Sequence, residues 1–290
     1  MFSASFDYYR AGSIAEAQQL LREHPGAKLL AGGHSLIPLM KMRLAAPAAV
    51  VDIGRIPDLK GVSSSGPALR IGALTTHAEL AASALLRASC PMLAEAAGEV
   101  GDAQVRNVGT IGGNIAHADP ASDLPTVLAA LDTTIRAVGP KGERTIPVGD
   151  FFQGMMTTAL GPDEILTAID VPSKPAGQGM AYVKFSHPAS RYAVIGAAAV
   201  LSMKDGVCTA ARVAIGGLLP APVRCPGVER AIEKQRISTE SVTRAAAEVS
   251  QALAPTGNVM GDIFASAEYR QAMAPVYVGR ALTAAAVRTE

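Results

Sequence analysis

Along the first part of the chain, apolar residues at helical spacing alternate with short apolar runs typical of strands. A helical spacing of apolar residues follows Ser13 and Glu16, which have the three-residue separation of a capping box. Short apolar runs at residues 28–30 and 49–53 have the length of buried strands, and a short helix is predicted between them. Residues 1–60 are therefore predicted to form a small α/β unit in the order strand, helix, strand, helix, strand.

The middle of the chain, residues 61–175, is predicted to form a second unit of mixed strands and helices. Residues 90–100 place alanine and leucine on one helical face. Residues 133–146 alternate around a glycine-containing turn and predict a hairpin, and residues 164–172 predict a strand closed by proline. The glycine-rich segment 109–114 is predicted to be a loop between these elements.

The pattern changes again after residues 173–179, a segment rich in proline and glycine that predicts a linker. Three apolar runs between residues 180 and 218 then predict a three-stranded antiparallel sheet, and the chain from residue 227 onward is mainly helical in pattern. The predicted division is into three parts: 1–60, 61–175 and 176–290.

Composition excludes several classes of function. The 290 residues carry a net charge of +1, contain no tryptophan and include only 4% aromatic residues, so neither charge nor stacking surface favours nucleic acid. No run of about 18 apolar residues predicts a membrane span, and the N-terminus lacks the basic start and apolar core of a signal peptide. The three cysteines include no CxxC pair, so no disulfide framework, zinc or iron–sulfur site is expected, and we expect a cytoplasmic protein.

Two glycine segments carry the candidate chemistry: "AGGHSL" (residues 31–36) and "TIGGN" (residues 110–114). Glycine allows positive φ and lets backbone N–H groups approach a ligand, and N–H groups ahead of a helix favour an anion. Two such segments would hold the two phosphates of a dinucleotide from opposite sides, with a cation supplied from elsewhere, because neither contains lysine or arginine. The alternative for each segment taken alone is an ordinary tight turn.

Other candidate groups have structural interpretations. His117, Asp119 and Asp123 are metal-ligand types, but "HADPASD" more often forms a capped turn. No GxSxG elbow, GxGxxG fingerprint or GxxxxGK[ST] P-loop is present. The segment "SHPASRY" (186–192) is equally consistent with a loop beside a ligand and with a strand cap. Four methionines are expected to pack in the core rather than to form a cofactor site: Met40, Met42, Met155 and Met156.

Taken together with their flanks, the two glycine segments resemble a known family. "AGGHSLIPLMKMRLAAP", followed by "VVDI" and "TIGGNIAHADPASDLP", is similar to the FAD-binding medium subunit of the molybdenum hydroxylases, such as aerobic carbon monoxide dehydrogenase and bacterial xanthine, nicotine, quinoline and caffeine dehydrogenases. The resemblance covers essentially the whole chain. It implies an α+β fold: a two-subdomain FAD-binding fold of the vanillyl-alcohol-oxidase-like (PCMH) type, followed by a C-terminal domain with a three-stranded antiparallel sheet and a helical bundle.

The resemblance also implies roles for particular residues. The first glycine segment would wrap the FAD pyrophosphate with backbone amides, and the second would complete the phosphate and ribityl contacts. Lys184 would supply the cation that both segments lack, and Tyr192 would lie near the isoalloxazine ring. His34 stands where many relatives have glutamine, as it does in members similar to carbon monoxide dehydrogenase. The implied cofactor-binding residues are Ala31, Gly32, Gly33, His34, Ser35, Leu36, Thr110, Ile111, Gly112, Gly113, Asn114, Asp123, Ile165, Leu166, Lys184 and Tyr192.

The implied function is electron transfer. FAD in this chain would receive electrons from [2Fe-2S] clusters on a small partner subunit, after hydroxylation of a substrate at a molybdenum–molybdopterin cofactor on a large partner subunit. The protein would bind and orient the cofactor, so no catalytic residue is expected in this chain. A dimer of such heterotrimers is the expected assembly, and the substrate is chosen on another chain.

Two alternatives from other classes remain open at this point. A free-standing flavin oxidase or reductase would need its own substrate pocket, and bleaching of its flavin by substrate in the isolated chain would favour it. A non-catalytic binding or assembly protein would use the glycine segments for structure alone, and a purified chain that binds no flavin would favour that class.

Overall fold

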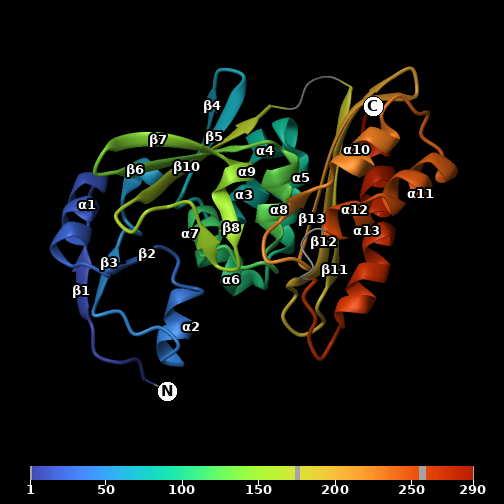
Figure 1. The fold of residues 1–290 in the computed structure, drawn as a ribbon. Helices are drawn as coiled ribbons and strands as arrows, with labels where there is room; N and C mark the ends of the chain where they lie inside the picture. The colour runs from blue at the N-terminus through green and yellow to red at the C-terminus, as the bar shows by residue number, and fades with distance from the viewer. Residues whose placement is uncertain (1, 174–176, 255–258, 290) are drawn as a thin grey trace.

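The computed structural model describes residues 2–173, 177–254 and 259–289, and it is elongated, with the N-terminal helix at one end and the C-terminal helices at the other (Figure 1). The N-terminal region is built around a three-stranded parallel sheet in the order β1-β3-β2. Its strands and helices alternate along the chain as the sequence pattern predicted. Its elements are β1 (Asp7–Arg10), α1 (Ile14–Glu23), β2 (Lys28–Leu30), α2 (Leu36–Lys41), β3 (Ala49–Asp52) and a 3-10 turn (Pro57–Leu59).

Helix α1 begins where the capping pattern predicted. The Ser13 hydroxyl accepts a hydrogen bond from the Glu16 amide at 3.1 Å. The Glu16 carboxylate accepts from the amide of Gly12, at 2.7 Å, instead of from the amide of Ser13 as a strict capping box requires. Ala17 and Leu21 of this helix are buried in the same core cluster as strand β3. The helix is thus fixed against the sheet that carries the first glycine segment.

The middle region contains a five-stranded antiparallel sheet in the order β4-β5-β10-β6-β7, with helices packed beside it (Figure 1). The strands of this sheet are β4 (Val62–Ser65), β5 (Ala68–Gly72), β6 (Thr134–Gly139), β7 (Gly142–Pro147) and β10 (Ile165–Pro172). Two further strands, β8 (Phe152–Gly154) and β9 (Thr157–Thr158), form a separate two-stranded sheet. The helices of this region are α3 (His77–Ala82), α4 (Ala84–Ser89), α5 (Pro91–Glu99), α6 (Ala103–Val108), α7 (Ile111–His117), α8 (Asp123–Ala130) and α9 (Val148–Phe151).

The second glycine segment differs from its prediction. Residues 111–114 were predicted to be a loop, but they form the first turn of helix α7. The Thr110 hydroxyl caps this helix by accepting a hydrogen bond from the Gly113 amide at 3.2 Å. Glycine lowers helix propensity, which is why the sequence pattern favoured a loop. The neighbouring backbone, described below, explains why glycine is nevertheless used.

The C-terminal region is a sheet followed by helices. Four strands form an antiparallel sheet in the order β11-β12-β13-β14, one short strand more than predicted. The strands are β11 (Gln178–Ser186), β12 (Ala193–Lys204), β13 (Val207–Gly216) and β14 (Val223–Arg224), and the helices are α10 (Pro226–Ile232), α11 (Thr239–Ala247), α12 (Val249–Leu253) and α13 (Ala267–Val287). Strand β11 begins inside the predicted linker 173–179, and the predicted boundary at 175/176 lies outside the described residues. Among the helices described, none has the length and hydrophobicity needed to cross a membrane.

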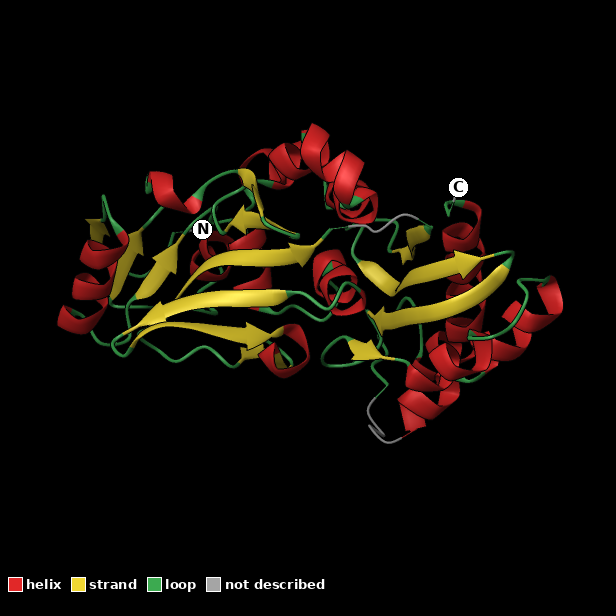
Figure 2. Ribbon diagram, turned by 90° about the horizontal axis from the view of Figure 1, so that it is seen from above, coloured by secondary structure: helices red, strands yellow, loops and turns green. Residues whose placement is uncertain are grey.

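The sheet of the C-terminal region is covered on both faces. Alternate residues such as Tyr182 and Ala198 belong to the core of the middle region, whereas Ala197 and Ala199 belong to the core formed with the C-terminal helices. Helix α8 contacts β12 and β13, and helix α13 contacts β11 and β12. The C-terminal helices consequently gather at the end of the molecule opposite helix α1 (Figure 2). Strand β11 is therefore held rigidly against the middle region.

The methionine prediction is wrong for three of the four residues. Met40 is buried, but Met42, Met155 and Met156 are each more than half exposed. Met155 and Met156 lie in the short turn between β8 and β9, where no core is available to cover them. Their hydrophobicity alone could not reveal that position.

Candidate functional site

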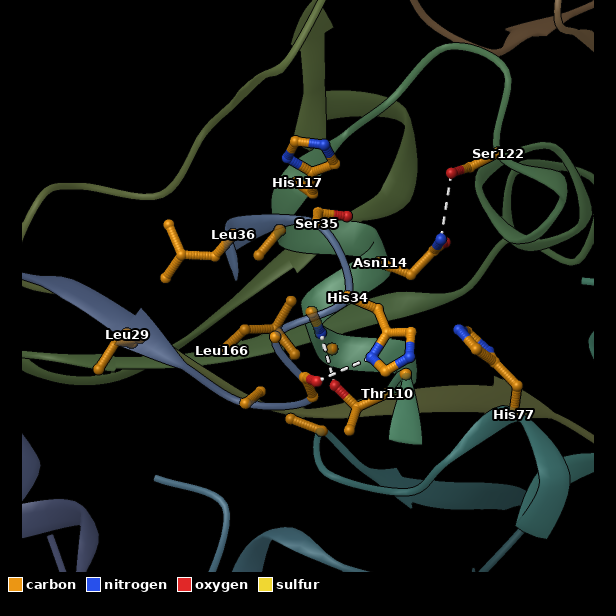
Figure 3. Close-up of a pocket in the computed structure, with 18 of the residues that line it drawn as sticks. Leu29, His34, Ser35, Leu36, His77, Thr110, Asn114, His117, Ser122 and Leu166 are labelled. Atoms are coloured by element: carbon orange, nitrogen blue, oxygen red, sulfur yellow. Dashed lines mark hydrogen bonds between the residues drawn. The ribbon is translucent and has the colours of Figure 1, made fainter. Parts of the chain in front are cut away.

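A cavity of about 540 Å³ lies where the N-terminal region, helix α7 and the loop between β11 and β12 meet (Figure 3). This volume is in the usual range for a cofactor or ligand pocket. Every residue of the predicted site lines the cavity except two, Ile111 and Lys184. Ile111 is fully buried in the hydrophobic core of the middle region. The structure thus brings the two glycine segments together, although they are about 80 residues apart in sequence.

The first glycine segment presents unused backbone donors to this cavity. Among the residues that the structure describes, the amide N–H groups of residues 32–36 have no hydrogen-bond acceptor. Gly33 has φ +69°, which turns the backbone between strand β2 and helix α2. Consecutive N–H groups around a left-handed residue form a concave site for an anion. This arrangement fits the phosphate groups of a dinucleotide.

The amides of the second segment are used differently from what was expected. The Ile111 amide donates to the Thr75 carbonyl at 3.0 Å, and the Gly112 amide donates to the Ala73 carbonyl at 2.8 Å. The Gly113 amide is occupied by the capping hydroxyl of Thr110. These bonds fasten α7 to the segment that follows strand β5 instead of leaving N–H groups free at the cavity.

The second segment can bind a ligand through a side chain, that of Asn114. The Asn114 side-chain amide donates to the Ser122 hydroxyl at 3.1 Å, while its Oδ1 atom is buried and has no partner among the described residues (Figure 3). A buried carbonyl without a donor is costly unless a ligand or water satisfies it. This atom is placed to accept a hydrogen bond from a ligand hydroxyl.

Close approach of the backbone explains two of the glycines. A Cβ atom added to Gly32 would overlap the carbonyl oxygen of Val108, which precedes the second segment. A Cβ atom added to Gly112 would lie 2.5 Å from the Cβ of Ala73. Gly32 and Gly112 therefore allow the two segments to pack against their neighbours, and this requirement is independent of any ligand.

Two histidines lie side by side at one end of the cavity (Figure 3). His34 Nδ1 is 3.1 Å from the Gly32 carbonyl and donates to it in the tautomer that this contact requires. His77 is almost fully buried, and its Nδ1 atom has no partner among the described residues. Burial, reinforced by the nearby positive groups of Arg106 and His34, lowers the pKa of His77 to about 4. His77 is therefore neutral at pH 7. No feature of the sequence identified it as part of the cavity.

This lowered pKa predicts an acid-sensitive stability. Because the unfolded histidine has a pKa near 6.5, the unfolded chain binds this proton more readily, so the free energy of unfolding falls between pH 6.5 and 4, by up to about 3 kcal/mol. Urea unfolding of the FAD-free chain across this range measures the loss. His77→Asn should flatten this part of the profile, whereas His24→Asn, in the half-buried turn after α1, should leave it unchanged. Identical profiles for wild type and His77→Asn would contradict the assignment.

Both carboxylates that line the cavity are engaged by basic groups. Asp123 is buried and accepts hydrogen bonds from the Tyr182 hydroxyl at 2.7 Å and from Lys184 Nζ at 3.1 Å. Burial raises the pKa of Asp123, and these two partners oppose the shift. Glu164 accepts two hydrogen bonds from Arg144, at 2.6 and 2.7 Å, which hold the pKa of Glu164 below its usual range. Neither group is free to act as a general base.

Lys184 lies behind the cavity wall. Its side chain is 2% exposed, and its Nζ atom donates to the carbonyls of Glu99 and Arg191, at 3.0 and 2.9 Å, as well as to Asp123. The resemblance implied that Lys184 would supply a cation at the cofactor. The structure instead places Lys184 outside the lining of the cavity. The cations that line the cavity are Lys28, at the start of β2, and Arg191. Lys28 lies three residues before the first glycine segment, and this position could have identified it in the sequence as a cation of the site.

Comparison with known proteins agrees with this geometry. Residues 4–174 match the family of the FAD binding domain in molybdopterin dehydrogenase, and residues 180–285 match the CO dehydrogenase flavoprotein C-terminal domain. The chain therefore belongs to the family of FAD-binding subunits of the molybdenum hydroxylases, which are oxidoreductases.

Individual relatives match over nearly the full length. The chain is 38% identical to the carbon monoxide dehydrogenase medium chain of Afipia carboxidovorans, over 100% of both chains. It is also 38% identical to the 6-hydroxypseudooxynicotine dehydrogenase complex subunit alpha of Paenarthrobacter nicotinovorans, over 97% of this chain and 94% of that one. The fold superposes on carbon monoxide dehydrogenase from Hydrogenophaga pseudoflava with a TM-score of 0.95 at 39% identity, covering 99% of each chain. These matches confirm the predicted family, its fold and its FAD-binding character.

Proposed function

We propose that the cavity holds FAD with its diphosphate on the backbone amides of residues 32–36. The observation that carries this proposal is that residues 32–36 all line the cavity and that their N–H groups have no acceptor among the described residues. Lys28 and Arg191 add positive charge around the same space. Asn114 Oδ1 would accept a hydrogen bond from a hydroxyl of the cofactor, and Tyr192 would pack against its ring system.

The chain's proposed role is electron transfer between partner subunits and an external acceptor. When bound, FAD supplies the redox chemistry, because a flavin exchanges electrons singly or in pairs. The protein's own groups bind and orient the cofactor. The engagement of Asp123 by Lys184 and of Glu164 by Arg144 supports a site without substrate acid–base chemistry. We therefore assign substrate hydroxylation to a large molybdenum-cofactor subunit, and the delivery of electrons to a small [2Fe-2S] subunit.

The substrate of the whole complex is set outside this chain. Two relatives that are equally similar, at 38% identity, belong by name to a carbon monoxide dehydrogenase and to a 6-hydroxypseudooxynicotine dehydrogenase complex. Similar flavoprotein subunits thus occur in complexes named for different reactions, which supports substrate selection on another subunit. We propose a cytoplasmic dimer of heterotrimers as the working assembly.

Purification of the chain together with its partner subunits tests this role. We expect about one FAD per copy of this chain, together with molybdenum and iron held by the proposed partner subunits. Substrate added without oxygen should bleach the flavin in the complex and should leave the flavin of the isolated chain oxidised. Bleaching in the isolated chain would instead establish a free-standing oxidase or reductase.

A further inference from the structure

The loop between β11 and β12 forms one wall of the cavity. Ser190, Arg191 and Tyr192 from this loop all line the cavity. The loop is closed on itself by hydrogen bonds from the His187 amide to the Tyr192 carbonyl and from the Arg191 amide to the His187 carbonyl, both 2.8 Å long. These bonds set the shape of the loop, but they do not fix where the loop lies relative to the cavity.

Lys184 supplies a link from the loop to the rest of the molecule. Its Nζ atom has three N–H donors and three acceptors: the Arg191 carbonyl in the loop, the Glu99 carbonyl at the end of α5, and the Asp123 carboxylate at the start of α8. Arg191 has φ +61°, a left-handed conformation that is unfavourable for a residue with a side chain and that aims its carbonyl at the lysine. A single buried ammonium group thus joins three separate segments.

We propose that Lys184 is a positioning residue that holds the 187–192 loop as a wall over the bound cofactor, and that it does not contact the cofactor itself. This inference rests on the proposed function, since it concerns how well FAD is shielded in the cavity. Asp123 fixes the ammonium group from the opposite side and is in turn fixed by Tyr182. Removing the ammonium group releases the Arg191 carbonyl, and the left-handed backbone at Arg191 can then relax away from the cavity.

Quenching of flavin fluorescence by acrylamide, in the full chain loaded with FAD, tests this proposal. Acrylamide is neutral, so its access to the flavin is not altered by the loss of a charge. Lys184→Met keeps the length of the side chain and removes the ammonium group, and we expect its quenching constant to rise about threefold or more because the wall opens locally. Tyr192→Ala should produce a similar rise by removing part of the wall directly.

The double variant separates positioning from general loosening. If Lys184 acts through the wall, Lys184→Met combined with Tyr192→Ala should quench no more strongly than either single variant, because the two changes remove the same shield. An additive increase would overturn the proposal.

Arg270→Met is the matched control. Arg270 is also a buried cation that donates to several carbonyls, among them those of Val194 and Gly217, but it does not line the cavity. Its removal should lower the melting temperature and leave quenching unchanged. If Lys184→Met instead matches wild type in quenching, the proposal fails while FAD binding stands. If the wild-type chain binds no FAD, the proposed function itself fails. Should Lys184→Met not fold, Lys184→Gln, which keeps one donor group, provides the same comparison.

Discussion

Replacing Gly113 with valine is expected to weaken FAD binding by about a hundredfold or more, equivalent to nearly 3 kcal/mol. Gly113 lines the cavity from the second glycine segment, and a Cβ atom there would lie 2.9 Å from the Thr110 hydroxyl and 3.9 Å from the Cβ of Ala31. The two valine methyl groups would extend into the space between the segments that the cofactor is proposed to occupy. Titration of FAD into the FAD-free variant, followed by flavin fluorescence, measures the loss.

A matched glycine controls for the general effect of adding a side chain. Gly149 lies in helix α9, and a Cβ atom there would meet no other atom within 4 Å. Gly149→Val should therefore bind FAD as wild type does. If Gly113→Val also binds FAD with wild-type affinity, the cofactor does not pass between the two glycine segments.

Replacing Gly112 with alanine is expected to destabilise the fold by about 3 kcal/mol, even without FAD, because overpacking of a rigid backbone contact cannot be relieved by a rotamer change. The added Cβ would lie 2.5 Å from the Cβ of Ala73 and 2.7 Å from its carbonyl oxygen. That carbonyl also accepts the hydrogen bond from the Gly112 amide, so helix α7 cannot shift away without losing it. Urea unfolding of the FAD-free protein measures the change.

Gly98 provides the control for this second variant. It lies within helix α5, where a Cβ atom would make an ordinary 3.7 Å contact with the Cβ of Ala81. Gly98→Ala should be neutral or stabilise the protein by up to about 1 kcal/mol, because alanine favours the helix and restricts the unfolded chain. Equal stability of Gly112→Ala and wild type would show that the close packing of α7 against Ala73 is not required.

The sequence predicted those features that depend on local patterns. Hydrophobic period placed the strands of the N-terminal region, the hairpin β6–β7 and the long strands of the C-terminal sheet. The prediction failed where a tertiary contact overrides a local preference. Residues 111–114 are helical despite two glycines, because Thr110 caps the turn and the amides of Ile111 and Gly112 bond to Thr75 and Ala73. Glycine is required at position 112 because Ala73 leaves no room for a side chain.

The candidate site shows the same limit. The two glycine segments could be found in the sequence, because paired glycines mark positions where the backbone must turn or pack closely. The different roles of the two segments could not be predicted from the sequence. The amides of the first segment are free, whereas the amides of the second are bonded to Thr75, Ala73 and Thr110. The resemblance implied that Lys184 supplies a cation at the cofactor, but its three acceptors hold it behind the cavity wall. No sequence pattern pointed to His77, which is brought to the cavity by long-range packing alone.

Equilibrium titration of FAD into the purified, FAD-free wild-type chain tests the central claim most directly. We expect saturation at about one FAD per chain, with submicromolar affinity and a change in flavin fluorescence, because the pocket has a suitable size and preformed donors. Failure of the folded chain to bind FAD would contradict this claim, and would leave the glycine segments with a purely structural role.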